Sequence, residues 1–251
     1  MSFLTALQFL TTIPIPWQRE ARQEDLARSI VYFPVVGLII GLILAGLSWL
    51  LAIILPSVVA NVLLIVSMVI LTGAIHLDGF VDTCDGIAGH KSVEERWKVM
   101  HDSRAGAFGI IGLALLLLVK YVSLNSIPWP LMIATLLFMP VVSRWAMVYA
   151  IFAYPYARPT GLGKAFNQGA RWPRFTVATL TTVVIAVVLT PLIHLTGLVL
   201  MFAIWVITVV LATYLKSKFS GLTGDTYGAI NEVAEGSVLI LINILVRLGL
   251  A

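Results

Sequence analysis

The sequence predicts an all-α polytopic membrane protein, a bundle of about six or seven transmembrane helices. Two observations carry this prediction. The 251 residues are 60% hydrophobic and 11% charged, with a mean hydropathy of +1.01, whereas a soluble domain has about 25% charged residues. Long apolar runs also recur along the chain, without the period-two alternation of a membrane β-barrel.

Six runs are long enough to be helices that cross the bilayer, because about 20 apolar residues span its hydrocarbon core. They are residues 30–55, 58–75, 108–124, 131–153, 175–193 and 195–214. A seventh run, 237–250, is short and contains Arg247, so its crossing is left open. Residues 1–29 are expected to form an N-terminal interfacial segment, since their semi-apolar start ends at Pro14-Ile15-Pro16. The whole chain is expected to form a single membrane domain.

Lys and Arg are concentrated in every second loop, which places them at one end of the predicted bundle. The loops near Pro56, residues 125–130 and His194 contain no Lys or Arg. Cytoplasmic loops of membrane proteins carry the excess of Lys and Arg, which places the N-terminus and the basic loops in the cytoplasm. Thirteen of the 16 Lys and Arg lie there: Arg19, Arg22, Arg28, Lys91, Arg96, Lys98, Arg104, Arg158, Lys164, Arg171, Arg174, Lys216 and Lys218.

The acidic residues give an independent indication of the same side. All 12 Asp and Glu fall in these basic segments or their flanks. The active site is therefore expected at the cytoplasmic end, with residues 76–107 as its main segment. The net charge of +4 suits contact with anionic membrane lipid. The basic residues are scattered and form no nucleic-acid-binding module, so no nucleic acid partner is expected.

Besides Arg247, two cations lie inside the apolar runs. Lys120 lies near the end of its run and is expected to extend its ammonium group to the interface. Arg144 lies deeper and, if it faces the bundle, needs an anionic partner, either an acidic residue or a phosphate. In the first run, the Gly37-xxx-Gly41 spacing favours close packing of helices.

The most informative polar feature follows the second run, where no side chain from residue 29 to residue 77 is formally charged. Asp78, Asp82 and Asp85 then occur at i, i+4 and i+7, within about 60° of one another on a helix. Three like charges beside a bilayer repel and lose solvation, so a cation is expected on them. Mg²⁺, which prefers carboxylate oxygen, is the simplest candidate. His76, just before, either binds phosphate or lies at the interface.

Three further segments supply candidate ligands. Residues 98–109 offer Asp102 as another metal ligand, Arg104 as a planar phosphate clamp, and Ser103 as the N-cap of the next helix. Residues 220–235 are rich in Gly and carry Asp225, Asn231 and Glu232, with Asp225 and Glu232 on one helix face. Residues 156–164 combine Arg158, Lys164 and Gly, and could hold an anionic substrate.

Three of these segments, in order along the chain, resemble the signature segments of the cobalamin synthase (adenosylcobinamide-GDP ribazoletransferase) family. They read HLDGFVDTCDG at residues 76–86, DSRAGAFG at 102–109 and GLTGDTYGAINE at 221–232. Ser220, where a glycine is expected, is a small departure that affects the shape of the loop.

The resemblance implies a Mg²⁺-dependent transferase of the last assembly stage of vitamin B12, in the cytoplasmic membrane of a prokaryote. Such an enzyme joins adenosylcobinamide-GDP to α-ribazole, or its 5′-phosphate, and releases GMP. We expect Asp78, Asp82, Asp85 and Asp102 to hold metal, and Asp85 or Asp225 to accept the ribose hydroxyl proton. Arg104 would clamp a phosphate. The other expected substrate-binding residues are His76, Ser103, Arg158, Lys164, Asn231 and Glu232.

Two other functions stay open. A CDP-alcohol phosphotransferase acting on lipid also uses a stripe of aspartates, although its full motif is not matched here. An ion-coupled transporter also carries intramembrane acids, although such acids usually lie near the midplane, often within repeated halves. Assembly into a homo-oligomer is left open as well.

Overall fold

The structure is a computed structural model that describes residues 2–15, 22–89, 91–193 and 195–250. In these ranges the chain is almost entirely helical, and its only β-type pairing is an isolated bridge between Tyr156 and Leu222. The predicted all-α class is confirmed. Arg19, Glu20 and His194, which entered the prediction of sidedness, lie outside the described residues.

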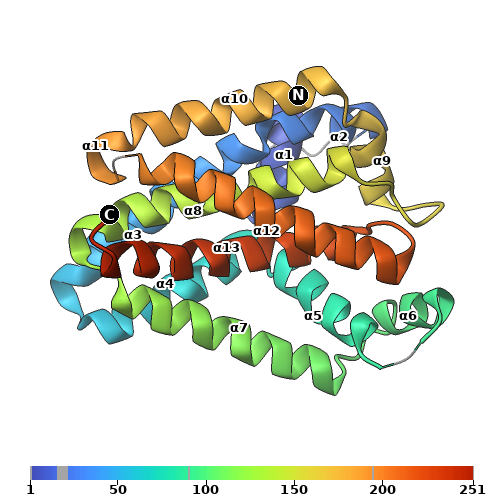
Figure 1. The fold of residues 1–251 in the computed structure, drawn as a ribbon, viewed down its shortest axis with the longest axis horizontal. Helices are drawn as coiled ribbons and strands as arrows, with labels where there is room; N and C mark the ends of the chain where they lie inside the picture. Colours follow the sequence, from blue (N-terminus) through green and yellow to red (C-terminus); the bar gives the residue numbers. More distant parts are fainter. Residues whose placement is uncertain (1, 16–21, 90, 194, 251) are drawn as a thin grey trace.

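Long helices lie side by side and form the bundle, and short helices cluster at one of its ends (Figure 1). The long helices are α3 (Phe33–Ile54), α4 (Ser57–Thr72), α7 (Ala107–Ser126), α8 (Trp129–Ala153), α10 (Trp172–Val188), α12 (Thr196–Phe219) and α13 (Gly224–Arg247). The short ones are α1 (Ser2–Leu10), α2 (Gln23–Ser29), η1 (Ile30–Tyr32), α5 (Ile75–Ile87), α6 (Val93–Met100), α9 (Leu162–Gly169) and α11 (Thr190–Ile193).

Helix α8 forms the core of the bundle, because nearly all its side chains from Met132 to Ile151 are buried. Helix α3 packs directly on it. Gly37 lies against the backbone of Pro140, and a Cβ on Gly41 would be 2.8 Å from the carbonyl oxygen of Leu136. The expected close packing through the GxxxG spacing is confirmed.

In the described residues, six helices are long and apolar enough to cross a membrane, and a seventh span results if α4 and α5 are counted together. This agrees with the six or seven predicted spans. The second span was expected over 58–75, but α4 ends at Thr72 and the chain bends by 92° into α5. The last run, 237–250, whose crossing was left open, covers the second half of α13 (Gly224–Arg247) and the three residues after it. Helix α13 is long and apolar enough to cross a membrane.

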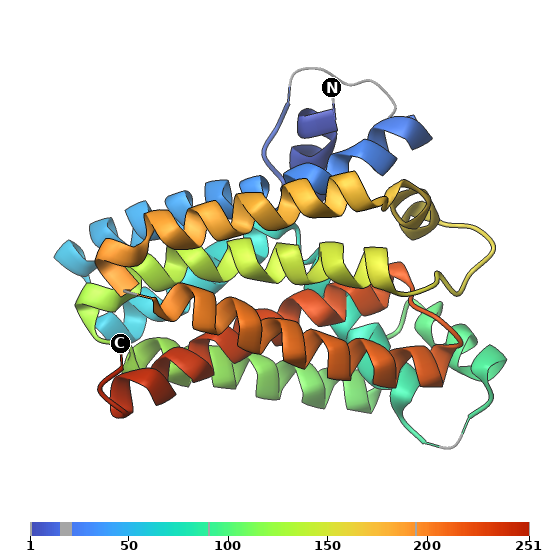
Figure 2. The ribbon, with the colours of Figure 1, turned by 45° about the horizontal axis from the view of Figure 1, so that its top comes forward.

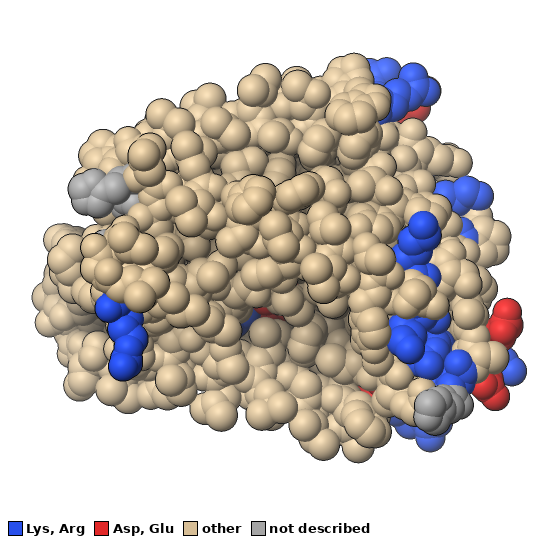
Figure 3. All heavy atoms as spheres, in the orientation of Figure 1, with Lys and Arg blue, Asp and Glu red and all other residues tan. Residues whose placement is uncertain are grey.

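Charged side chains gather mainly at one end of the bundle, on the right in Figure 3. This end carries the turns from α5 to α6, from α8 to α9 and from α12 to α13. Figure 2 shows α1 and α2 packed beside α9 near the same end. A smaller basic group lies at the other end, on the left in Figure 3. Helix α13 also finishes at a basic residue, Arg247. The charged segments predicted to share one side therefore do share one end of the fold.

Candidate active site

A sharp turn directs the aspartate helix, α5, away from the apolar helix before it. Gly73 and Ala74 both have left-handed backbone angles, with φ of 60° and 58°. The N-terminal segment supports this turn: the backbone N–H of Thr12 donates to the carbonyl of Leu71 at 2.8 Å, and its hydroxyl donates to that of Ile70 at 2.9 Å. The Leu71 carbonyl, in the last turn of α4, thereby gains a partner from outside the helix.

Glycine allows α5 to touch the start of α13. A Cβ on Gly79 would lie 2.7 Å from the carbonyl oxygen of Asp225 and 2.9 Å from its Cα. On the other side of the contact, Gly228 faces the backbone of His76. Only side-chain-free positions permit this approach, and it brings the Asp78 and Asp82 turns of α5 beside Asp225.

Four carboxylates consequently interact electrostatically. The half-buried Asp82 lies within range of Asp78 and Asp85 on its own helix and of Asp225 on α13. Among the described residues, no three His, Cys, Asp or Glu side chains already converge as a metal site. Mg²⁺ in phosphoryl-transfer sites is usually held by one or two carboxylates together with substrate phosphates. Adjacent Asp78 and Asp82 oxygens fit that mode of binding.

Arg158 is held beside Asp225 by the pairing of two loops. Ala157 donates its backbone N–H to Leu222 at 2.8 Å, and Leu222 donates to Pro155 at 2.8 Å. The Arg158 guanidinium then donates to the Asp225 carboxylate at 3.0 Å. The turn that carries Asp225 is itself fixed, because Thr223 and Thr226 form a capping box at the start of α13.

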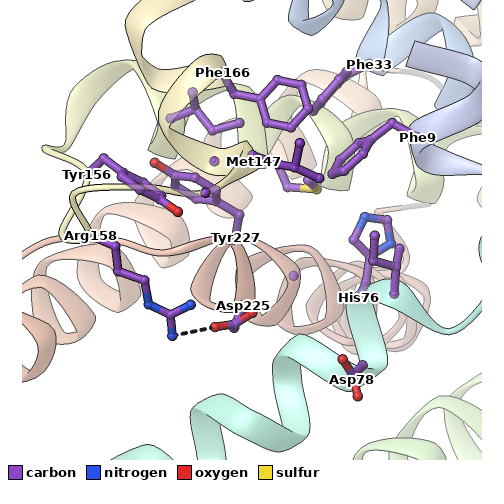
Figure 4. Close-up of a pocket in the computed structure, with 17 residues that line it drawn as sticks. Phe9, Phe33, His76, Asp78, Met147, Tyr156, Arg158, Phe166, Asp225 and Tyr227 are labelled. Atoms are coloured by element: carbon purple, nitrogen blue, oxygen red, sulfur yellow. Dashed lines mark hydrogen bonds and ion pairs between the residues drawn. The ribbon is translucent and has the colours of Figure 1, made fainter. Parts of the chain in front are cut away.

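These residues lie around a cavity of about 250 Å³ (Figure 4). Asp78, Asp225 and Arg158 lie along one side, and His76 lies at another. Lys164 is not part of the lining; its ammonium group donates to the Pro159 carbonyl at 2.5 Å. The structure thus brings together four of the residues predicted from the sequence. They come from three separate segments, because His76 and Asp78 share α5.

Asp85 has a different position. Its two oxygens accept the backbone N–H groups of Gly106 at 2.7 Å and of Gly109 at 2.9 Å. These are free donors at the start of α7, where a negative charge is also favoured by the helix dipole. Asp85 therefore joins α5 to α7, and neither oxygen is free of a hydrogen bond. Its predicted roles as metal ligand and as proton acceptor remain predictions.

Asp102 and Arg104 lie outside the cavity that Asp78, Asp225 and Arg158 line. Arg104 donates to both Asp102 oxygens, at 3.0 and 2.8 Å, and these bonds lower the pKa of Asp102 to about 2. The exposed pair lines a separate open cavity of about 600 Å³ with Lys91 and Asp85. Ser103 was expected to cap α7, and this was wrong: α7 begins after Gly106, whose φ and ψ are extended. Asp85 from another helix supplies the cap instead.

Asn231 and Glu232 were expected to bind substrate, but they are buried within the bundle. Both glutamates of α13 contact Lys120 of α7: its Nζ is 2.6 Å from Glu232 Oε2 and 2.6 Å from Glu235 Oε2. Arg144 of α8 also donates to Glu235, as does Asn231 at 3.2 Å. We call Lys120, Arg144, Glu232 and Glu235 the interior charge network.

The interior charge network corrects two expectations. Lys120 is 1% exposed and does not reach the interface. The glutamates were expected at the charged end, yet they lie about 12–17 Å along α13 from its start at a rise of about 1.5 Å per residue. Arg144 has an acidic partner, which was one of the two options predicted. The available sequence signal for these pairs was the position of Lys120 and Arg144 inside apolar runs, where a cation needs an acidic partner.

Comparison with known proteins identifies relatives that match nearly the whole chain. A curated protein from Geotalea daltonii, named adenosylcobinamide-GDP ribazoletransferase, is 41% identical over 236 residues, covering 93% of each chain. Proteins of the same name from Desulforamulus reducens and Roseiflexus are 37% and 38% identical, covering 96% and 92% of this chain and 95% and 84% of their own. No solved structure matches. The family described as cobalamin-5-phosphate synthase matches residues 2–243, and the chain belongs to this family of cobalamin-pathway transferases.

Proposed function

We propose that this membrane transferase joins adenosylcobinamide-GDP to α-ribazole, or to α-ribazole 5′-phosphate, and releases GMP. The names of the similar proteins support this choice of substrates. The observation that carries it in the structure is the meeting of Asp78 from α5, Asp225 from α13 and Arg158 at one cavity, with Asp82 within electrostatic range of all three. A diphosphate needs cationic neutralisation, and a hydroxyl nucleophile needs a proton acceptor.

We propose Mg²⁺ as the cofactor. Carboxylate oxygens of one helix, one turn apart, suit a hard divalent cation. Asp78 and Asp82 would hold the ion, with Asp225 close to it. When bound, the ion neutralises negative charge on the diphosphate and on the departing phosphate.

The reaction can proceed as a single displacement without a covalent enzyme intermediate. The acceptor hydroxyl oxygen attacks the phosphorus that bears the cobinamide, and a new P–O bond forms there. The bond from that phosphorus to the bridging oxygen breaks, and GMP leaves with this oxygen. Asp225 accepts the hydroxyl proton, because its carboxylate lies at the cavity whereas both oxygens of Asp85 accept backbone N–H groups.

Arg158 takes the position in which Arg104 was expected. Its guanidinium lines the cavity and already neutralises Asp225, so it can bind a phosphate oxygen of the diphosphate. Arg104 lines the other, open cavity with Lys91, where it could contact an outer part of the same large substrate. We further propose that the charged end of the bundle faces the cytoplasm of a prokaryote, since Lys and Arg accumulate there.

The direct test uses purified protein in detergent with Mg²⁺, adenosylcobinamide-GDP and α-ribazole, and measures GMP and the joined product by chromatography. We expect GMP release that requires both substrates. A transporter or a CDP-alcohol phosphotransferase would release none, and that result would reject the proposal.

A single variant tests the carboxylate group. Asp82→Asn preserves the size of the side chain but removes its charge, so we expect loss of turnover while the protein remains folded and membrane-inserted. Glu94→Gln on the exposed surface of α6 is the matched control, because it removes one carboxylate that does not belong to the group of Asp78, Asp82, Asp85 and Asp225. Near-normal turnover of purified Asp82→Asn would exclude the proposed metal binding.

A further inference from the structure

The cavity has an aromatic wall that catalysis of phosphate transfer does not require. Phe9 of α1, Phe33 of α3 and Phe166 of α9 lie together at one side of it (Figure 4). The ring centroid of Phe9 is 4.7 Å from that of Phe166, and Phe33 is 5.6 Å from Phe166. Three helices far apart in the sequence thus contribute one ring each to the lining.

Two tyrosines and a methionine continue the apolar lining. Tyr156 and Tyr227 lie with ring centroids 6.4 Å apart, and Met147 lies between them and the phenylalanines in Figure 4. Ile151 of α8 completes this part of the lining. A flat ring system can contact aromatic faces and a polarisable thioether favourably in such a space.

His76 adds a buried imidazole to this part of the lining. It is 3% exposed, and neither of its ring nitrogens has a hydrogen-bond partner in the described structure. A buried polar group without a partner is costly, so a ligand that hydrogen-bonds to it would be stabilised. The charged groups Asp78, Asp225 and Arg158 lie on the opposite side of the cavity from the phenylalanines.

The cavity therefore suits one class of ligand. Its volume of about 250 Å³ is just below the ~300–1,000 Å³ of drug-sized ligand sites. The cavity is therefore too small for a corrinoid. A guanine base presents several donors and acceptors along one edge, and the phenylalanines, Met147 and Ile151 offer them no partner. A benzimidazole-type base has an apolar outer edge and, once attached to ribose, a single free ring nitrogen.

We propose that this cavity holds the bicyclic base of the acceptor nucleoside, with His76 donating a hydrogen bond to its free ring nitrogen. The ribose then points toward the charged side, where Asp225 can reach the attacking hydroxyl group. This inference rests on the proposed function and assigns the acceptor, rather than the guanosine, to this part of the site. It also makes His76 and the phenylalanines determinants of base specificity.

The first test compares Michaelis constants of purified variants. Phe9→Leu removes an aromatic ring from the lining, and because base stacking on an aromatic side chain contributes about 1–3 kcal/mol, we expect the KM for α-ribazole to rise about tenfold. The KM for adenosylcobinamide-GDP should not change. Phe3→Leu on the same helix is the matched control, since Phe3 packs on Tyr32 and does not line the cavity.

The second test isolates the histidine with an altered ligand. An indole riboside has a carbon where the benzimidazole has its free nitrogen. Wild-type protein should prefer the benzimidazole riboside by about five- to tenfold, as expected for one hydrogen bond of ~1 kcal/mol, and His76→Leu should remove the preference. Equal preference in both proteins, or a KM increase only for adenosylcobinamide-GDP, would overturn the proposal.

A binding measurement separates this inference from the proposed reaction. Titration of wild-type and Phe9→Leu protein with α-ribazole alone, followed by nucleoside fluorescence, needs no turnover. Weaker binding in Phe9→Leu supports the base site even if no GMP is released, in which case the proposed function alone has failed. Normal GMP release with equal α-ribazole affinity in both proteins would reject the base site and leave the reaction intact.

Discussion

Removing Lys120 should destabilise the fold strongly, because it leaves Glu232 buried without its cationic partner. The Lys120 and Glu232 side chains are 1% and 5% exposed, and their charged atoms are 2.6 Å apart. At an effective dielectric constant of about 20, the Coulomb attraction across such a distance is about 6 kcal/mol, part of which offsets lost solvation. Breaking a buried pair from one side costs about 3–5 kcal/mol.

The Lys120→Met variant keeps the length and apolar stem of the side chain, and its free energy of unfolding can be measured by titration of mixed micelles with denaturing detergent. We expect a loss of about 3–5 kcal/mol. The double variant Lys120→Met with Glu232→Gln should recover part of this loss, since it removes both charges.

An exposed ion pair supplies the control. Arg28 and Glu24 are 3.7 Å apart, with side chains 62% and 84% exposed, and surface pairs contribute about 0–1 kcal/mol. Glu24→Gln should therefore change the stability very little. If Lys120→Met is no more destabilising than Glu24→Gln, or if the double variant is less stable than either single variant, the interior charge network does not hold the helices as reasoned here.

Three further outcomes are expected. Gly79→Ala would place a Cβ 2.7 Å from the Asp225 carbonyl oxygen and push α5 away from α13. Because misplacing a catalytic group by about 1 Å can lower the rate about 10²-fold, kcat should fall about 10- to 100-fold in the GMP assay. An unchanged kcat would show that the contact is not needed. Ser220→Gly should raise the unfolding free energy by up to about 1 kcal/mol, since Ser220 has φ of 61°; a loss of stability in the same detergent titration would contradict this. Arg104→Gln should raise the pKa of Asp102 from about 2 toward ~3.9, as measured by NMR of labelled protein. Because the pKa of Asp102 is lowered in the folded protein, its ion pair with Arg104 stabilises the fold at pH values above the ordinary aspartate pKa, and this stabilisation is lost as the pH falls toward 2. An Asp102 pKa that Arg104→Gln leaves unchanged would contradict the assigned cause.

The sequence was sufficient to predict the fold class, because hydrophobic length and loop charge are local quantities. The apolar runs predicted the helices that could cross the membrane, and the distribution of Lys and Arg predicted which segments share one end. The spacing of Asp78 and Asp82 also predicted correctly that they lie one turn apart on a helix. Each of these inferences depends on residues near one another along the chain.

Only the tertiary structure decided which distant residues meet. The bend after Thr72 and the small size of Gly79 bring α5 onto α13, and this sets Asp225 beside Asp82. The packing of the helices also sets Asp85 against the backbone N–H groups at the start of α7. It buries Lys120 beside Glu232 and Glu235. A side chain's partner is fixed by the contact between helices, and the sequence around it records only that a partner is needed.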